Sequence, residues 1–294
     1  MRNAVAGALV AGAVVVVAAC GIGAVGSLDA TGGVDASGVG DAIGADGNPN
    51  ATDGAVGSDG SSANDANPMN DGGPNGRVPG ALALYTFDDG TGMKVSDVSG
   101  VAPPLDLTIQ VPNGTRWIDG GLAVDTASLL YSGAASKIIS ASKLTNEVTV
   151  EAWIKPVTMS NGTIQRITGI SVQVANPVVT ISAQNNSYLF RIRTSGQLTD
   201  GDNDIFTAGG MKLALQHVVM TRSANGIQRG YVDGVLATEE HATVGDLSTW
   251  TDLAIAVANE HTADRPWLGE LRLVAYYGRA LSAAEVQQNF TSGP

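Results

Sequence analysis

The chain has 294 residues, a single cysteine and a formal net charge of −12. The acidic excess argues against nucleic acid and anionic membrane surfaces as partners, because both repel negative charge. One cysteine, Cys20, excludes an intrachain disulfide. The length allows one or two domains, but the first part of the chain lacks the apolar residues for a core, so we expect one folded domain of about 215 residues.

Residues 1–19 have the pattern of an export signal. The basic residue Arg2 precedes an unbroken run of apolar residues and glycine from residue 4 to residue 19, which is shorter than the roughly 20 residues of a membrane span. The run ends in Val17-Ala18-Ala19-Cys20, which resembles the bacterial lipobox. The resemblance implies an exported protein that is lipidated on Cys20. Gly21 in place of Asp favours the outer membrane or cell surface. The alternative is an uncleaved anchor.

Residues 20–79 have the composition of a disordered linker. The segment is rich in Gly, Ala and Asp and contains no aromatic residue and no Glu, so burial cannot offset the entropy lost on ordering. Asp recurs there with a period of six, which raises the alternative of a calcium-binding solenoid. The known calcium repeat has a nine-residue period with an apolar position. We therefore favour a tether whose reach is on the order of 40–45 Å.

Residues 80–294 read as an all-β domain. Short apolar runs separated by turn residues are typical of an antiparallel sandwich or jelly roll. Asp233-Gly234 between apolar residues is a strong hairpin signal. The expected strands lie at residues 81–87, 147–154, 177–182, 187–193, 216–222, 230–236, 253–258 and 269–277.

The end of the chain combines a strand with a short helix. Ser282 is a good N-cap, and Glu285 three residues later completes a capping box. Leu281 and Val286 fit a hydrophobic staple across this cap. Because strand side chains alternate, we expect one face of the preceding strand to carry Leu271, Leu273, Ala275 and Tyr277.

Five motifs in chain order resemble the laminin-G-like, concanavalin-A-like jelly-roll family of bacterial exported proteins. They lie at residues 84–90 (LYTFDDG), 97–100 (DVSG), 148–156 (VTVEAWIKP), 231–234 (YVDG) and 269–290. The resemblance implies a two-sheet sandwich over roughly residues 81–291. The sequence departs from the family after Gly100, where Val-Ala-Pro-Pro replaces the usual Asn and Gly.

Catalysis on this fold has a recognisable signature. Glycosidases with the same sandwich carry three acids at alternate positions of one strand, whereas here Thr149 stands between Glu147 and Glu151. These two glutamates would lie about 13 Å apart, which exceeds the separation of paired catalytic carboxylates. We expect them to form a solvated face and expect no enzyme activity. We expect His217, in an apolar strand, to be a packed ring.

Structural calcium has two candidate positions, because this ion binds carboxylate and carbonyl oxygens on tight loops. The family resemblance implies Asp97 and Glu270, with Asp88 as a further ligand. The alternative is an irregular loop that contains Asp200, Asp202 and Asp204. An EF-hand is excluded there, because Ile205 stands where that loop needs Gly. All these acids also suit ordinary turns.

A ligand site on such a sandwich combines a ring with amides and charges. The candidates are Asn185, Asn186, Tyr188, Arg191, Arg193 and Trp250. Core positions are the alternative for the aromatic residues. We therefore expect a membrane-anchored extracytoplasmic binding module for polysaccharide or an extracellular protein. A glycoside hydrolase or lyase, and a structural surface lipoprotein, are the alternatives.

Overall fold

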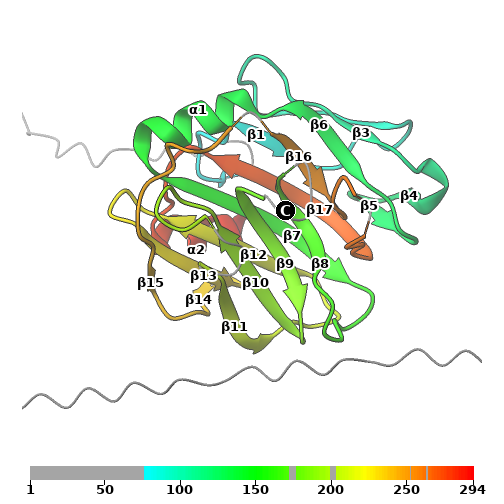
Figure 1. The fold of residues 1–294 in the computed structure, drawn as a ribbon. Coiled ribbons are helices and arrows are strands. Elements are labelled where there is room, and N and C mark those ends of the chain that lie inside the picture. Colours follow the sequence, from blue (N-terminus) through cyan, green and yellow to red (C-terminus); the bar gives the residue numbers. More distant parts are fainter. Residues whose placement is uncertain (1–75, 172–176, 199–202, 252, 263) are drawn as a thin grey trace, which may run out of the picture. The chain divides into compact units, whose positions relative to one another are not determined.

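The computed structural model describes residues 76–171, 177–198, 203–251, 253–262 and 264–294. These residues belong to one compact unit, 64–294. Within the described ranges, two antiparallel sheets pack face to face (Figure 1), as predicted. Cys20, the signal segment and nearly all of the expected linker lie outside the described residues, as do Asp200 and Asp202. No helix in the described ranges is both long and apolar enough to cross a membrane.

Sheet A has the strand order β14-β13-β12-β7-β17-β5-β4, with β1 paired to β17 and β15 paired to β13. Its strands are β1 (Ala83–Tyr85), β4 (Thr115–Ile118), β5 (Gly121–Val124), β7 (Val148–Pro156), β12 (Gln216–Arg222), β13 (Ile227–Val232), β14 (Val235–Leu236), β15 (His241–Ala242) and β17 (Gly269–Tyr277).

Sheet B has the order β11-β10-β9-β8-β16-β6-β3-β2. Its strands are β2 (Lys94–Val95), β3 (Leu107–Ile109), β6 (Leu130–Ala134), β8 (Gln165–Ile170), β9 (Val179–Gln184), β10 (Ser187–Ile192), β11 (Ile205–Gly210) and β16 (Ala254–Val257). The helical elements of the described chain are η2 (Pro112–Gly114), α1 (Ser136–Thr145) and α2 (Ala283–Ser292).

Two tight hairpins follow from residues that accept positive φ. Asp233 and Gly234 have φ values of 52° and 78° and join β13 to β14. Asn185 and Asn186 have φ values of 50° and 59° and join β9 to β10. Both pairs meet the requirement of a two-residue turn whose twist matches the strands. The predicted Asp-Gly hairpin is therefore confirmed.

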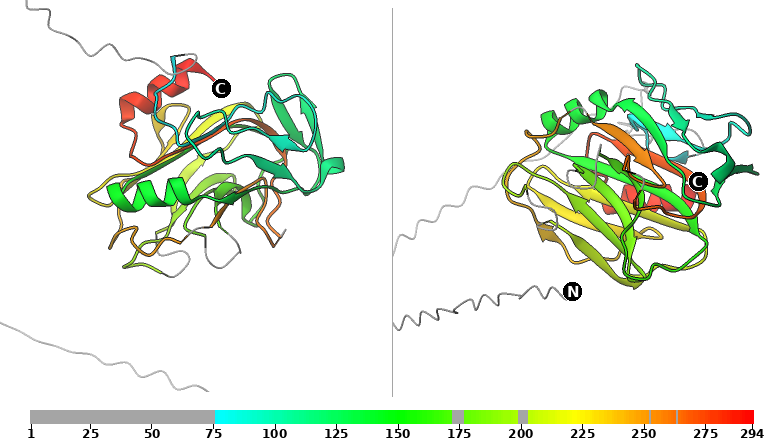
Figure 2. Two further views of the ribbon diagram at one scale, coloured as in Figure 1. Left: turned by 90° about the horizontal axis from the view of Figure 1, so that it is seen from above. Right: turned by 45° about the vertical axis from the view of Figure 1, so that its right-hand side comes forward.

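The main core lies between the sheets, but the centre of sheet A is buried on both sides. A second cluster covers its outer face, where α2 packs on the side away from sheet B (Figure 2). The members of this outer cluster are Val78, Trp153, Val219, Tyr231, Leu273, Ala275, Tyr277, Leu281 and Val286. Strand β7 is consequently buried along both of its faces.

The prediction that Leu271, Leu273, Ala275 and Tyr277 share one face of β17 is wrong for Leu271. The pairing of β17 with β7 shifts between Leu271 and Leu273, so that Arg272 has no partner residue across the ladder. This extra residue is a β-bulge, which reverses the alternation beyond it. Leu271 therefore packs between the sheets, whereas Leu273 and Tyr277 pack beneath α2.

The helix start at Ser282 is confirmed. The Ser282 hydroxyl accepts a hydrogen bond from the Glu285 amide at 3.3 Å, and the Glu285 carboxylate accepts one from the Ser282 amide at 2.7 Å. Leu281 and Val286 are both buried in the outer cluster. The capping box and staple thus fix α2 against sheet A.

Candidate functional site

Glu151 was expected to be solvated, and this expectation is wrong: its side chain is fully buried under α2. Its carboxylate accepts hydrogen bonds from Arg77, from Asn289 at 2.9 Å and from the Tyr277 hydroxyl at 3.3 Å. His217 Nε2 lies 2.7 Å from the same carboxylate. Burial raises the pKa of Glu151, but hydrogen bonds and charge from His217 and Arg77 outweigh it and bring the pKa to about 2.

The Glu151 cluster, which comprises Glu151, Arg77, His217, Tyr277 and Asn289, fastens the start of the domain to its end. Arg77 also donates to the Gly293 carbonyl at 2.7 Å. The amide of Val78 donates to the Asn289 side chain at 2.8 Å. Arg77 and Val78 are buried, so the packed structure starts before the expected boundary at residue 80.

His217 is a packed ring, as predicted. It is fully buried and stacks on Trp153 with ring centroids 4.9 Å apart. Phe290 of α2 stacks on Trp153 at 5.7 Å and on His217 at 6.0 Å. Glu151 and His217 are therefore closed to solvent, whereas Arg77 and Tyr277 also line a neighbouring pocket of about 270 Å³.

Asp97 has a set of partners that does not fit a calcium ligand. Its Oδ1 accepts from the amides of Leu84 at 3.1 Å and Ser99 at 3.0 Å. Its Oδ2 accepts from the amide of Leu105 at 2.9 Å and from Lys137 Nζ at 2.7 Å. A carboxylate offers about four lone-pair positions, and here every one faces a hydrogen.

Among the described acids of the two proposed calcium sites, Glu270 and Asp204 are paired with basic side chains. Glu270 pairs with Arg272 and with Lys155 at 3.0 Å, while Asp88 is exposed. Both oxygens of Asp204 accept hydrogen bonds from Arg191 at 2.7 Å. Within the described ranges, no group of three or more His, Cys, Asp or Glu residues is arranged to hold a metal ion.

The residues expected to bind a ligand are not brought together. Tyr188 is fully buried in the main core, where its hydroxyl lies 2.8 Å from the Gln216 side chain. Trp250 is likewise in the core and donates to the carbonyl of Arg193 at 2.7 Å. The structure thus differs from the expectation for both rings: β10 places Tyr188 between the sheets, and Trp250 packs into the main core from the segment that precedes β16.

The remaining candidates lie on the surface or the outer face of sheet B. Asn185 and Asn186 are exposed in the β9–β10 turn, and Arg193 is half-buried. Arg191 is nearly buried and held by Asp204. The stretch from Tyr188 to Arg193 therefore divides between both faces of sheet B, as the alternation of a strand requires.

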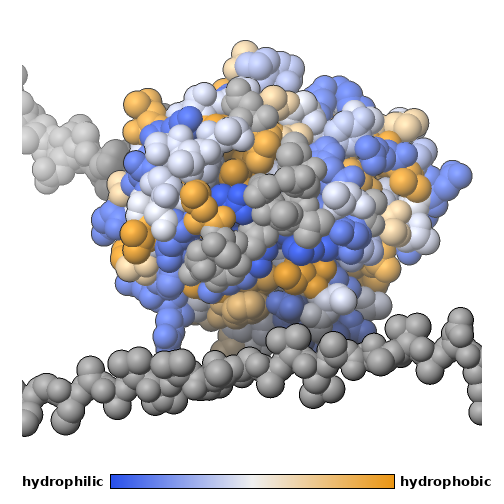
Figure 3. Space-filling model, in the orientation of Figure 1, coloured by the Kyte–Doolittle hydropathy of each residue, from blue (hydrophilic) through white to orange (hydrophobic). Residues whose placement is uncertain are grey.

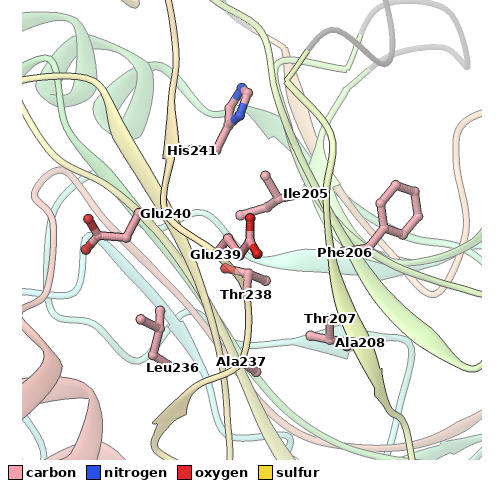
Figure 4. Close-up of a pocket in the computed structure, with 10 residues that line it drawn as sticks. All are labelled: Ile205, Phe206, Thr207, Ala208, Leu236, Ala237, Thr238, Glu239, Glu240 and His241. Atoms are coloured by element: carbon pink, nitrogen blue, oxygen red, sulfur yellow. The ribbon is translucent and has the colours of Figure 1, made fainter.

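An open groove of about 650 Å³ lies where the outer strands of the two sheets meet (Figure 4). One wall is β11 of sheet B, and the other is the segment 236–241 of sheet A. The lining residues are Ile205, Phe206, Thr207, Ala208, Leu236, Ala237, Thr238, Glu239, Glu240 and His241. None of the ligand residues expected from the sequence lines this groove.

Local structure explains the shape of the groove. Strands β14 and β15 both pair with β13, and residues 237–240 connect them. Thr238 fastens this connection to β13, because its hydroxyl accepts a hydrogen bond from the Gly230 amide at 2.9 Å. The Cβ of any larger residue at Gly230 would lie 2.3 Å from the Phe190 ring. It would also lie 2.7 Å from Thr238 Cγ2, so the absence of a side chain at Gly230 lets Thr238 lie close to β13.

The groove is lined by one partly exposed aromatic residue and two glutamates, and in Figure 4 the Phe206 ring points from β11 away from segment 236–241. On β11, Ile205 is buried and Phe206 is 46% exposed. Glu239 is exposed and its side chain is directed between the two walls (Figure 4). Glu240 points to the other side and pairs with Arg229 at 2.5 Å. On the face in Figure 3, hydrophobic and hydrophilic patches alternate.

The paired antiparallel sheets, the outer cluster beneath α2 and the groove between the sheet ends define a lectin-like sandwich domain. A family model for the concanavalin A-like lectin/glucanases superfamily matches residues 132–287. The chain belongs to this family. No curated protein sequence matches the chain.

Solved structures share the fold. A Trypanosoma rangeli sialidase in complex with 2,3-difluoro-KDN is 16% identical, with a TM-score of 0.56 over 76% of this chain and 35% of the sialidase. A structure of botulinum neurotoxin type C, whose cell entry depends on interaction with two ganglioside molecules, is 13% identical over 72% of this chain and 51% of that one, with a TM-score of 0.55.

The binding domain of Paraclostridial Mosquitocidal Protein 1 is 15% identical, with a TM-score of 0.56 over 72% of this chain and 52% of its own. This chain thus spans about a third of the sialidase and about half of each toxin structure. At these identities the likeness concerns the fold alone.

Proposed function

We propose that the domain is a non-catalytic binding module that holds a chain of neutral sugars in the groove between β11 and residues 236–241. One observation carries this proposal: Phe206, which is 46% exposed, and Glu239, which is exposed, both line one open groove. A sugar offers both an apolar face of C–H groups and a rim of hydroxyls, so it can use both partners.

The chemistry of the groove selects among glycans. The Glu239 carboxylate accepts hydrogen bonds from two neighbouring hydroxyls, and such charge-assisted bonds are stronger than neutral ones. Glu239, Glu240 and the net charge of −12 repel acidic sugars. The volume of about 650 Å³ is within the usual range of ligand sites. A neutral polysaccharide therefore fits better than an anionic one.

Two observations support binding without hydrolysis. Glu151 is buried and its carboxylate is occupied by hydrogen bonds. Glu147 accepts from the amides of Ala224 at 3.1 Å and Ala280 at 3.2 Å. The two glutamates that matched the spacing of glycosidase acids thus both have structural partners. Release of reducing sugar from the bound polysaccharide would refute this part of the proposal.

A protein ligand is the second candidate. Strands β11 and β14 are the last strands of their sheets, and a free strand edge can pair with an extended peptide. The comparisons include a botulinum neurotoxin DC binding domain in complex with rat synaptotagmin II. The acidic groove would then favour a basic peptide.

Affinity electrophoresis in gels that contain neutral or anionic polysaccharides tests the proposal. We expect a neutral polymer to retard the wild type, and Phe206→Ala to weaken that affinity about tenfold through loss of stacking. Leu213→Ala is the matched control, because Leu213 is 53% exposed and does not line the groove. Equal retardation of both variants, or retardation by anionic polymers only, would contradict the proposal.

We also propose that the domain is exported and lipid-anchored through Cys20. The support is the sequence Val17-Ala18-Ala19-Cys20 after an apolar run. Labelling with a radioactive fatty acid tests this, and we expect Cys20→Ala to abolish the label. Equal label on the wild type and the variant would remove the lipoprotein proposal.

A further inference from the structure

We propose that the ammonium group of Lys137 takes the place that a structural calcium ion occupies at the β1–β2 end of related domains. The domain then holds its own cation and needs no divalent metal there. This inference is independent of the groove and of its ligand.

The position of Lys137 comes from α1, in whose first turn it lies. Its Nζ is 2.7 Å from Asp97 Oδ2 and 2.7 Å from the carbonyl oxygen of Val101. The side chains of Lys137 and Asp97 are 10% and 0% exposed. An ammonium group that contacts a carboxylate and a backbone carbonyl has the kind of oxygen ligands that calcium prefers.

Asp97 has no free lone pair for a metal. Three backbone amides and Lys137 supply four hydrogens to its two oxygens. Hydrogen-bond donors around a carboxylate exclude a cation from the same directions. The amide of Asp97 also donates to Asp106 at 2.9 Å, so this second carboxylate helps to orient the loop.

The pKa of Asp97 agrees with the geometry of the ion pair. Burial raises the pKa of Asp97, but the hydrogen bonds from Lys137, Ser99 and Leu105 lower it further than burial raises it. Asp97 is therefore ionised at neutral pH. A buried carboxylate of this kind requires a compensating cation, and Lys137 supplies it.

The arrangement joins β1, the loop after β2 and α1. Asp97 binds Leu84 of β1, the loop that reaches Leu105, and Lys137 of α1. A metal ion in such a place has the same mechanical role, because it cross-links loops through shared ligands. Because Lys137 is itself a residue of α1, its contact with Asp97 attaches the loop directly to this helix.

Thermal unfolding of the full chain tests the proposal. We expect the melting temperature of the wild type to be the same in millimolar calcium and in EDTA. We expect Lys137→Met to lower it by about 5–10 °C, because it leaves a buried carboxylate without its cation. Lys94→Met is the matched control, since Lys94 pairs with Asp106 at 3.1 Å on the surface and is 61% exposed.

Two results would overturn the proposal. The first is a rise of several degrees in the wild-type melting temperature on addition of calcium. The second is a Lys137→Met variant that melts at the same temperature as Lys94→Met. If Lys137→Met does not fold, the calcium and EDTA measurement on the wild type still decides the matter.

Discussion

Two regions of this domain contain the same kinds of side chain in opposite environments. The first is the Glu151 cluster, in which Glu151 and His217 lie beneath α2 without exposure to solvent. The second is the groove, whose lining includes Glu239, His241 and the partly exposed Phe206. A glutamate, a histidine and at least one aromatic side chain occur in both.

The regions differ in whether their polar groups are free to contact a ligand. The carboxylate of Glu151 has four side-chain partners within the protein, so a ligand would have to displace one of them. Glu239 faces an open groove. Residue types alone therefore indicate chemistry without showing whether it serves folding or binding, and burial decides between the two.

The largest effect should come from Glu151→Gln. This substitution leaves Arg77 and His217 with a weaker partner in a buried site, and loss of one member of a buried pair costs about 3–5 kcal/mol. Urea unfolding measures the change. Glu239→Gln, the same substitution in the groove, should change the free energy of unfolding by less than about 0.5 kcal/mol. Similar losses in both variants would remove the distinction between the regions.

Acid should destabilise the domain through the same carboxylate. The pKa of Glu151 is about 2 in the folded protein and 4.5 in its usual state. A lowered folded pKa gives stability that is present above pH 4.5 and is lost as the pH falls toward 2, by about 3 kcal/mol in total.

Melting temperatures measured at a series of pH values from neutral to acid would show this loss. The Glu151→Gln variant, which lacks the titrating group, should lose less stability over the same interval. Parallel pH profiles for the wild type and the variant would contradict the assignment to Glu151.

Phe206→Ala should separate binding from stability. The ring is 46% exposed, so we expect a change of less than about 1 kcal/mol in the free energy of unfolding. The dissociation constant for the neutral polysaccharide should nevertheless rise about tenfold. Calorimetry can measure both quantities on one preparation. A large loss of stability would show that Phe206 belongs to the core.

The smallest effect should come from Glu239→Gln on binding. An amide still accepts a hydrogen bond but lacks the charge, so we expect affinity for a neutral polysaccharide to fall by about threefold to tenfold. Affinity for anionic polymers should rise, because one repulsive charge is removed. An unchanged preference between neutral and anionic polymers would exclude Glu239 from the site.

Local rules predicted much of the fold. The Asp233-Gly234 hairpin and the Ser282 capping box are confirmed because each depends on neighbouring residues. Helix α1 was not predicted, and its N-cap, Ala135, makes no side-chain capping bond. The start of α1 therefore lacks the signal that identified α2.

Long-range contacts explain the errors. Glu151 is covered by Arg77 and by Asn289 of α2, which are 74 and 138 residues away in the chain. The alternation of side chains along β7 therefore did not indicate that other residues bury Glu151. The bulge at Arg272 depends on the partner strand. The groove joins Phe206 to Glu239 across two sheets. The sequence signal that could have indicated Phe206 as a surface residue is its place between Ile205 and Thr207, because the alternation of a strand directs it outward.

Hydrogen exchange with and without a saturating neutral polysaccharide would locate the bound ligand. The proposed site predicts slower exchange in β11 and in residues 235–242, while β7 and α2 exchange at unchanged rates. Protection confined to other strands, or protection in β7 and α2 without any change in β11, would contradict the assignment of the groove as the binding site.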